Sequence, residues 1–257
     1  MAVRLFDSHG HYTDERICDD ALIKEIFSGG VERILVPSSD LADSEAAVAI
    51  AERYDGMFAA VGIHPHEVEK APPLSEAEDK LSALLRHPKA VAIGETGLDY
   101  YYGAETKELQ SVYFDMQLSL AEKTGYPIIV HDRDAHGDTL DAVKAHGKAR
   151  GVLHSCSCSA ETVKEYLRLG WFISFSGVIT FKNANRILES LAAVPLDRLL
   201  IETDCPYLAP VPMRGKTNHS GYLKYTAARA AEVLGVDTDT LAEATYKNAC
   251  ALFGIDP

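Results

Sequence analysis

Short apolar runs alternate with amphipathic helical patterns along the chain, and this alternation restricts the fold more than any other feature. Nearly continuous apolar runs of strand length are typical of parallel strands that helices cover on both faces. The expected strands occupy residues 3–8, 33–37, 58–63, 90–95, 127–131, 151–154, 172–176 and 199–202. The expected helices occupy residues 19–28, 43–54, 75–86, 105–124, 138–146, 160–169, 183–194, 220–234 and 238–253.

Eight such units are the number that closes a barrel, so the pattern predicts an α/β fold, a (β/α)₈ TIM barrel. Residues 238–253 would add an extra C-terminal helix. A doubly wound open sheet is the structural alternative. The length of 257 residues suits one barrel, and neither a linker nor a low-complexity segment interrupts it. Residues 1–257 are therefore expected to form a single domain.

Charge and cysteine content restrict the partners and the compartment. The formal net charge is −13, whereas duplex binding depends mainly on Lys and Arg side chains that neutralise phosphates. A nucleic-acid substrate would therefore be short or single-stranded and held locally. The five cysteines are odd in number and scattered, so they do not indicate a disulfide framework. No run has the length of a membrane span or resembles a signal peptide. We expect a cytoplasmic protein with no membrane contact and no obligate protein partner.

Two histidines, His9 and His11, stand two residues apart at the end of the first expected strand. Side chains alternate between the faces of a strand, so both imidazoles would point into the barrel mouth, as a metal site requires. Asp7 would share that face and could orient a histidine or lie behind the metal. An isolated His-x-His pair is equally consistent with two unrelated polar residues.

Recurrence of the same arrangement strengthens the metal interpretation. Four other strands also end at a residue that can bind a metal, namely Glu95, His131, His154 and Asp204. The strands are parallel, so all these residues would meet at the C-terminal rim of the barrel. Four histidines and two carboxylates are a plausible ligand set for a dinuclear Zn²⁺, Mn²⁺ or Mg²⁺ site.

Several longer motifs extend from the first strand to the loop after the eighth. They are Asp7-Ser8-His9-Gly10-His11, Gly62-Ile63-His64-Pro65-His66, Gly94-Glu95-Thr96-Gly97-Leu98-Asp99-Tyr100, His131-Asp132-Arg133-Asp134-Ala135, Glu202-Thr203-Asp204-Cys205-Pro206-Tyr207-Leu208 and Ala209-Pro210-Val211-Pro212-Met213-Arg214-Gly215-Lys216. Together they resemble the TatD family of metal-dependent hydrolases. The resemblance implies an amidohydrolase-like TIM barrel with two divalent metal ions and phosphodiester substrates, which are usually DNA.

The resemblance also implies roles for individual residues. The positions that match the family's metal ligands are His9, His11, Glu95, His131, His154 and Asp204. Glu95 would bridge the two metals. Asp204 would accept a proton from the water between the metals as general base, the resulting metal-bridging hydroxide would attack the phosphorus, and His154 or His64 would assist the leaving group. The implied enzyme is a deoxyribonuclease, a 3′-5′ exonuclease acting on single-stranded or damaged DNA.

Other polar residues receive more modest interpretations. His64, Arg133, Arg214 and Lys216 are the candidates for contacts with substrate phosphate. Cys156 and Cys158 could suggest a soft metal site, but without a second pair we interpret them as small core residues. Cys205 lacks an evident base and is not expected to be a nucleophile. His87, His136 and His146 are expected on the solvated surface.

The chain departs from the family pattern at two places. Cys156 and Cys158 replace an aromatic residue and a glycine, and Asn218-His219-Ser220 replaces Asn-Glu-Pro. The substrate is therefore less determined than the metal. One alternative uses the same site to hydrolyse another ester, such as D-aminoacyl-tRNA, and would release an amino acid instead of nucleotides. Another alternative is a non-catalytic metal-binding interaction protein, which would turn over none of these substrates.

Overall fold

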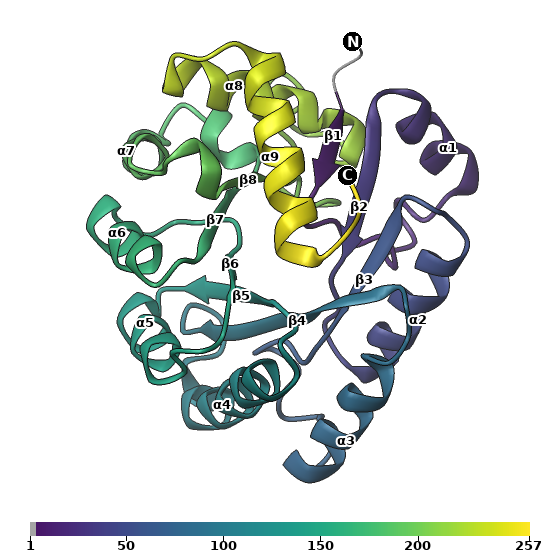
Figure 1. The fold of residues 1–257 in the computed structure, drawn as a ribbon, viewed down its shortest axis with the longest axis vertical. Coiled ribbons are helices and arrows are strands. Elements are labelled where there is room, and N and C mark those ends of the chain that lie inside the picture. Colours follow the sequence, from purple (N-terminus) through teal and green to yellow (C-terminus); the bar gives the residue numbers. More distant parts are fainter. Residues whose placement is uncertain (1–3) are drawn as a thin grey trace.

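The computed structural model describes residues 4–257, and in them eight parallel strands form one sheet in the order β1 to β8, surrounded by helices (Figure 1). This arrangement confirms the TIM barrel. The part of the first expected strand at residue 3 lies outside the described residues. The strands are β1 (Leu5–Asp7), β2 (Val31–Val36), β3 (Met57–Val61), β4 (Ala90–Asp99), β5 (Ile128–Arg133), β6 (Gly151–Leu153), β7 (Phe172–Phe175) and β8 (Leu199–Ile201).

The helices lie within a few residues of their expected positions. They are α1 (Asp20–Ser28), α2 (Leu41–Glu52), α3 (Leu74–Leu84), α4 (Lys107–Thr124), α5 (His136–Ala145), α6 (Ala160–Arg168), α7 (Asn185–Ala192), α8 (Leu223–Leu234) and α9 (Thr238–Phe253). Short 3₁₀ turns precede α4 and α8. Helix α9 is the extra C-terminal helix that the sequence predicts. None of the helices in residues 4–257 combines the length and apolar character needed to cross a bilayer.

Strand alternation divides the apolar side chains into two cores. On β5, Ile128 and Val130 pack outward against the helices, whereas Ile129 faces the barrel interior. The interior core is closed at the bottom by α9, which crosses the barrel end in Figure 1. There Phe6 of β1 meets Tyr246 and Phe253 of α9, with ring centroids 6.2 and 6.0 Å apart. The lower end of the barrel is thus filled with apolar side chains, which leaves the upper rim for polar ones.

Strand β4 contains a bulge that the sequence pattern did not predict. Ile93 pairs with Ile128 and Thr96 pairs with Val130, so β4 advances one more residue than β5 between the two pairs. A bulge of this kind turns the side chains beyond it to the opposite face. Glu95 would otherwise share the outward face of Ile93. Gly94 permits the distortion, since its φ is 143° and an added Cβ would lie 2.8 Å from the Cβ of Ile129.

The first and last strands are joined mainly by the segments that follow them. The amide of Ser8 donates to the carbonyl of Ile201 over 3.3 Å. Beyond the strands, the amide of His11 donates to the carbonyl of Cys205 at 2.8 Å, and the amide of Asp204 donates to the carbonyl of His9 at 2.9 Å. We call these two post-strand segments, residues 8–11 and 203–205, the closing seam. The barrel is therefore closed by the stretches of chain that also carry candidate ligands.

Asp7 supports the seam and does not face the barrel mouth, so the expected position of its side chain is wrong. Its carboxylate accepts hydrogen bonds from the amide and hydroxyl of Thr203, at 2.9 and 2.5 Å, and from the hydroxyl of Ser220 at 2.6 Å. Burial raises the pKa of Asp7 to about 6, although these hydrogen bonds act in the opposite direction. Asp7 therefore ties the start of the barrel to its end.

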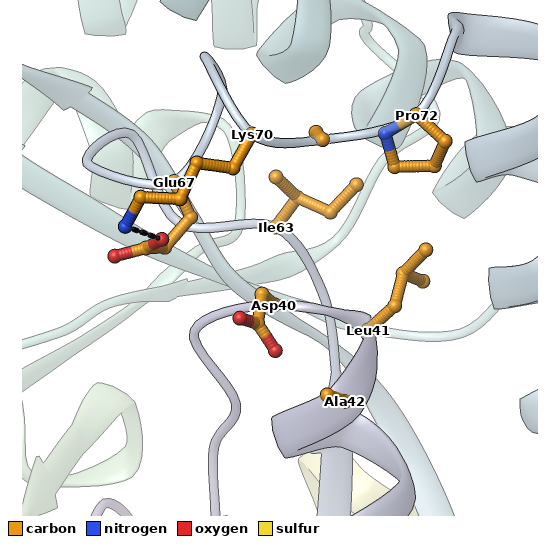
Figure 2. Close-up of a pocket in the computed structure, with 8 residues that line it drawn as sticks. Asp40, Leu41, Ala42, Ile63, Glu67, Lys70 and Pro72 are labelled. Carbon is orange, nitrogen blue, oxygen red and sulfur yellow. Dashed lines mark hydrogen bonds and ion pairs between the residues drawn. The ribbon is translucent and has the colours of Figure 1, made fainter.

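A pocket of about 200 Å³ lies outside the barrel, between the start of α2 and the segment after β3 (Figure 2). Ile63 and Leu41 line it, and the ion pair between Lys70 and Glu67, 2.7 Å long, lies at its edge. Ligand sites usually enclose about 300 to 1,000 Å³. This pocket is smaller, and its lining offers one ion pair among mainly apolar side chains, so we assign it no function.

Replacing Thr203 by valine tests the seam. The change keeps the shape of the side chain but removes the hydroxyl that donates to Asp7 and accepts from the amide of Cys205. We expect the free energy of unfolding to fall by about 1–3 kcal/mol, because buried polar atoms lose partners. Urea denaturation would measure this, with the exposed Thr217→Val as the matched control. Equal stability of the two variants would contradict the role of the seam.

Candidate metal centre

The carboxylate of Glu95 lies at the centre of a ring of imidazoles at the C-terminal rim. Its oxygens are 2.8 Å from Nε2 of His154 and 2.9 Å from Nδ1 of His131. Nε2 of His9 is 3.2 Å away, and those of His64 and His11 follow at 3.6 and 3.8 Å. Asp204 completes the ring, with Oδ1 at 3.4 Å from Nε2 of His11. The structure therefore brings together all six residues that the sequence proposed as ligands, and adds His64.

Strand geometry places the candidate ligands of the central strands. His131 lies two residues beyond Ile129 on β5 and shares its inward face, and His154 follows β6 in the same phase as Val152. Glu95 reaches the interior only because of the bulge in β4. The neighbouring Gly97 allows β4 and β5 to approach, since a Cβ there would stand 2.0 Å from the carbonyl oxygen of His131.

The closing seam places the other three candidate ligands. Strand β1 ends at Asp7, so strand alternation does not explain why His9 and His11 converge. Their rings meet because the backbone hydrogen bonds of the seam hold both residues against Asp204, and their Nε2 atoms are 3.2 Å apart. Asp204 has a φ of 54°, in the left-handed region that Asp tolerates better than most residues. The prediction of convergence was correct, but its physical reason was different.

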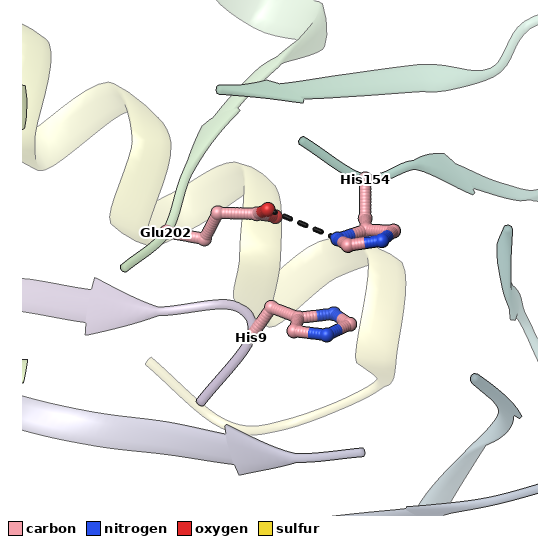
Figure 3. Close-up of side chains that lie close together, drawn as sticks. All are labelled: His9, His154 and Glu202. Carbon is pink, nitrogen blue, oxygen red and sulfur yellow. Dashed lines mark hydrogen bonds and ion pairs between the residues drawn. The ribbon is translucent and has the colours of Figure 1, made fainter. Parts of the chain in front are cut away.

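Two further carboxylates orient histidines from outside the ring. Glu202 accepts from Nδ1 of His154 over 3.1 Å and from the amide of Ser155 over 2.8 Å (Figure 3). Asp99 lies 3.1 Å from Nε2 of His131 and 2.8 Å from Nε2 of His66. Carboxylates behind metal-binding histidines fix ring orientation and raise ligand basicity. Neither role was expected from the sequence, although Glu202 stands in phase with the inward Leu200 and with Asp204.

The charges of the ring are strongly coupled. Although burial acts to raise the pKa of Glu95, His154, His9 and His64 hold it well below its ordinary value. The pKa of His154 is raised well above its usual value because Glu95 and Glu202 outweigh its burial. Burial lowers the pKa of both His9 and His64. The carboxylates and imidazoles of the centre thus shift one another's pKa values strongly, and the pKa shifts of the imidazoles differ in direction from one ring to the next.

The ring has the properties of a cation site. Nδ1 of His9 is buried and has no hydrogen-bond partner, and the His9 and His154 rings stack at 4.0 Å between centroids (Figure 3). Nδ1 of His131 lies 3.4 Å from Nε2 of His154. Nitrogens this close to each other and to carboxylates are better satisfied by a shared cation than by protons alone. The donor set of imidazoles and carboxylates fits Zn²⁺ and Mn²⁺, and its carboxylates also fit Mg²⁺.

Of the expected substrate residues, His64 lies in the ring itself, and the other three occupy two places around it. Arg133, at the end of β5, is exposed and lies over the rings of Tyr101 and Tyr102, 4.4 and 4.7 Å from their centroids. Arg214 and Lys216 are exposed in the long segment after β8. Arg214 donates to the carbonyl of Ala209 and lies over Phe181, so its described contacts are with its own loop and not with the ring.

The cysteine in the seam is not a nucleophile. Cys205 is fully buried, and burial raises its pKa well above the ordinary value, so it remains a thiol.

The departure from the family pattern at residues 218–220 does not disturb the elements around it. Asn218 donates to the carbonyls of Thr203 and Tyr207, while the His219 side chain accepts from the amide of Gly221 ahead of α8. The final helices are fully formed beyond this point.

A parallel barrel whose strands end at one ring of histidines and carboxylates defines the class of metal-dependent barrel hydrolases. The profile of the TatD related DNase family matches residues 6–254. The chain therefore belongs to the TatD family of metal-dependent hydrolases, as its motifs predicted.

Relatives of known sequence or structure cover nearly the whole chain. It is 39% identical to the uncharacterized metal-dependent hydrolase YabD of Bacillus subtilis, over 98% of this chain and 100% of that protein. It is 36% identical to a Klebsiella pneumoniae protein named 3′-5′ ssDNA/RNA exonuclease TatD, over 92% of each. The structure of YJJV, a TatD homologue from Escherichia coli K12, matches with a TM-score of 0.93 and 29% identity over 100% of both chains.

Replacing Glu202 by glutamine tests how the ring is oriented. The substitution keeps the size of the side chain but removes the negative charge behind His154. We expect the affinity for Mn²⁺ to fall about 10- to 100-fold, as for other residues that orient metal-binding histidines. Calorimetric titration would measure it, with the exposed Glu189→Gln as control. If both variants bound Mn²⁺ as the parent does, Glu202 would have no orienting role.

Proposed function

We propose that this chain hydrolyses phosphodiester bonds as a metal-dependent 3′-5′ exonuclease acting on single-stranded or damaged DNA. The observation that carries this proposal is the convergence of His9, His11, Glu95, His131, His154 and Asp204 at one rim. The TatD family supplies the reaction class, and the name of the Klebsiella pneumoniae relative supports the substrate and polarity.

The ligand groups divide naturally around Glu95. One group consists of His9, His11 and Glu95, and another consists of His131 and Glu95, with the ring of His64 beside it. Because Glu95 belongs to both, its two oxygens are placed to face two cations at once, which supports a dinuclear centre. Bound divalent cations would lower the pKa of a water molecule and stabilise negative charge on the phosphate.

Asp204 is the group best placed to receive a proton. Its side chain is 16% exposed, whereas that of Glu95 is 5% exposed, so water reaches Asp204 more easily. His11 and the other histidines keep its pKa below the ordinary value despite its burial. Asp204 is therefore ionised near neutral pH, and its carboxylate can take the proton of the attacking water as general base.

His64 and His154 have different parts in this proposal. Both ring nitrogens of His154 are engaged, one with Glu95 and one with Glu202, so His154 acts as a ligand that fixes the centre. Nδ1 of His64 accepts from the amide of His66, which leaves the proton of the neutral ring on Nε2. That N–H points toward the centre and can donate to a phosphate oxygen of the substrate.

Aromatic and arginine side chains beside the centre favour a single-stranded substrate. Tyr101 and Tyr102 are 59% and 61% exposed and lie under Arg133, and Tyr207 is 52% exposed beneath Arg16. Exposed rings and arginines allow unpaired bases to stack and phosphates to bind. We call Tyr101, Tyr102 and Arg133 the aromatic wall. Asp99 accepts from the amides of both tyrosines and also contacts His131, so the wall is fixed relative to the centre.

The net charge of −13 favours a short contact with the strand end over an extended one, because few phosphates can be neutralised. Arg214 and Lys216 would add phosphate contacts from the segment after β8.

The Asp204→Asn variant tests the reaction. Loss of the carboxylate removes the general base and one ligand, so we expect hydrolysis of single-stranded DNA with Mn²⁺ or Mg²⁺ to fall at least about 100-fold. The Glu95→Ala variant should also lose activity. Asp197→Asn, on the exposed turn before β8, is the matched control. Parent-level activity in Asp204→Asn would overturn the assignment.

The product that the protein releases shows which type of ester bond it hydrolyses. Release of nucleotides from the 3′ end of labelled single-stranded DNA is the expected result. Release of an amino acid from D-aminoacyl-tRNA without nucleotide release would instead favour the other ester hydrolase. If the metal-loaded protein turned over none of these substrates, the chain would be a binding protein.

The Tyr102→Ala variant tests the aromatic wall. Loss of one stacking partner is worth about 1–3 kcal/mol, so the KM for single-stranded DNA should rise by roughly tenfold or more. A small chromogenic phosphodiester has no strand to stack, so its kcat/KM should change little. Equal losses on both substrates would show that Tyr102 supports the centre and not the strand.

A further inference from the structure

A second group of metal-binding side chains lies on the outer face of β5. Asp132 directly follows His131, and alternation turns it outward, on the side of Val130. His136 is the first residue of α5, and Cys158 stands in the segment between β6 and α6. The barrel wall separates these three side chains from the ring around Glu95. Three different elements therefore bring a carboxylate, an imidazole and a thiol to one place.

The three side chains are in direct contact. Nδ1 of His136 is 2.9 Å from Oδ2 of Asp132, and Sγ of Cys158 is 3.2 Å from that nitrogen and 3.4 Å from that oxygen. The side chain of Asp132 is 1% exposed, and Oδ1 has no hydrogen-bond partner. A buried carboxylate oxygen without a partner is costly and indicates a missing ligand. The His136 side chain is 27% exposed, so an ion could enter from solvent.

We propose that Asp132, His136 and Cys158 form a second cation site that binds Zn²⁺ or a similar thiophilic divalent ion. The ligand atoms of these three residues lie within 4.8 Å of one another, and a water molecule entering beside the partly exposed His136 would complete the coordination. A ligand set of sulfur, nitrogen and oxygen donors is suited to zinc.

The observed distances fit tetrahedral coordination. Zinc bonds of about 2.0–2.3 Å place neighbouring ligand atoms about 3.3–3.6 Å apart. The three measured separations are 2.9, 3.2 and 3.4 Å. Each would have to lengthen by less than about 0.5 Å to admit the ion, which side-chain rotation can supply. No large movement of β5, α5 or the segment before α6 is needed.

This site changes two interpretations made from the sequence. His136 was expected on the solvated surface, but its ring is bonded to Asp132 and half-buried. Cys156 and Cys158 are buried, which confirms their position in the core. The sequence offered no second pair of ligands for them, and the fold supplies that pair as Asp132 and His136. The bound ion would fasten the segment that carries His131 to α5 and to the segment before α6.

Cobalt substitution of the full, reduced chain tests the proposal. Co²⁺ bound to a thiolate gives a near-ultraviolet charge-transfer band that histidine and carboxylate ligands do not produce, so the ring around Glu95 does not contribute to it. We expect this band in the parent protein and its persistence in Glu95→Gln. Cys158→Ser should lack the band and bind one Zn²⁺ ion fewer per chain. The buried Cys250→Ser, at the other end of the barrel, should retain both.

A second variant distinguishes loss of the cation site from misfolding caused by the Cys158→Ser substitution. The partly exposed His136→Ala leaves both cysteines in place, and we expect the affinity for Co²⁺ at the thiolate site to fall at least about tenfold. Circular dichroism would verify that each variant is folded. A parent protein without the band, or a band of equal strength and affinity in Cys158→Ser and His136→Ala, would overturn the proposal.

Discussion

The buried carboxylate of Glu95 needs hydrogen-bond donors or cations around it, and much of the upper barrel is arranged to provide them. Removing an ion from water is costly unless it is paired. Five imidazoles, those of His9, His11, His64, His131 and His154, therefore approach its oxygens within 2.8–3.8 Å. They come from four separate parts of the chain, and each must be held by its own backbone. The bulge in β4 turns Glu95 toward these imidazoles, because without it Glu95 would face the helices.

Hydrogen bonds connect this centre to carboxylates behind it, and through them to the surrounding loops. Glu202 and Asp99 orient histidines of the ring, and Asp99 also binds the amides of Tyr101 and Tyr102. The aromatic wall is thereby connected to the ligands by one carboxylate. A proposed substrate-binding side chain and a candidate metal ligand thus share a support, so hydrogen bonds to Asp99 set their relative position.

The sequence predicted the barrel and the convergence of six candidate ligands because both are repeated signals. Apolar runs recur eight times, and five of them end near a histidine or carboxylate. It could not predict the bulge at Gly94 and Glu95, because a single extra residue leaves the apolar pattern almost unchanged. It also misplaced Asp7, whose partners Thr203 and Ser220 lie about 200 positions away in the sequence. The group of Asp132, His136 and Cys158 was invisible for the same reason, since its members meet only when β5, α5 and the segment after β6 are assembled.

The closing seam has a consequence for how the protein can lose its structure. His9, His11 and Asp204 lie in the segments that join the two ends of the barrel. Any fluctuation that parts β1 from β8 also separates these three side chains. A cation bound between them would link the two post-strand segments, so the metal-loaded protein would resist separation of β1 from β8. Proteolytic attack and amide exchange at residues 8–11 would then report metal occupancy directly. In this barrel, opening the contact between β1 and β8 and losing the cation site at His9, His11 and Asp204 would therefore occur together.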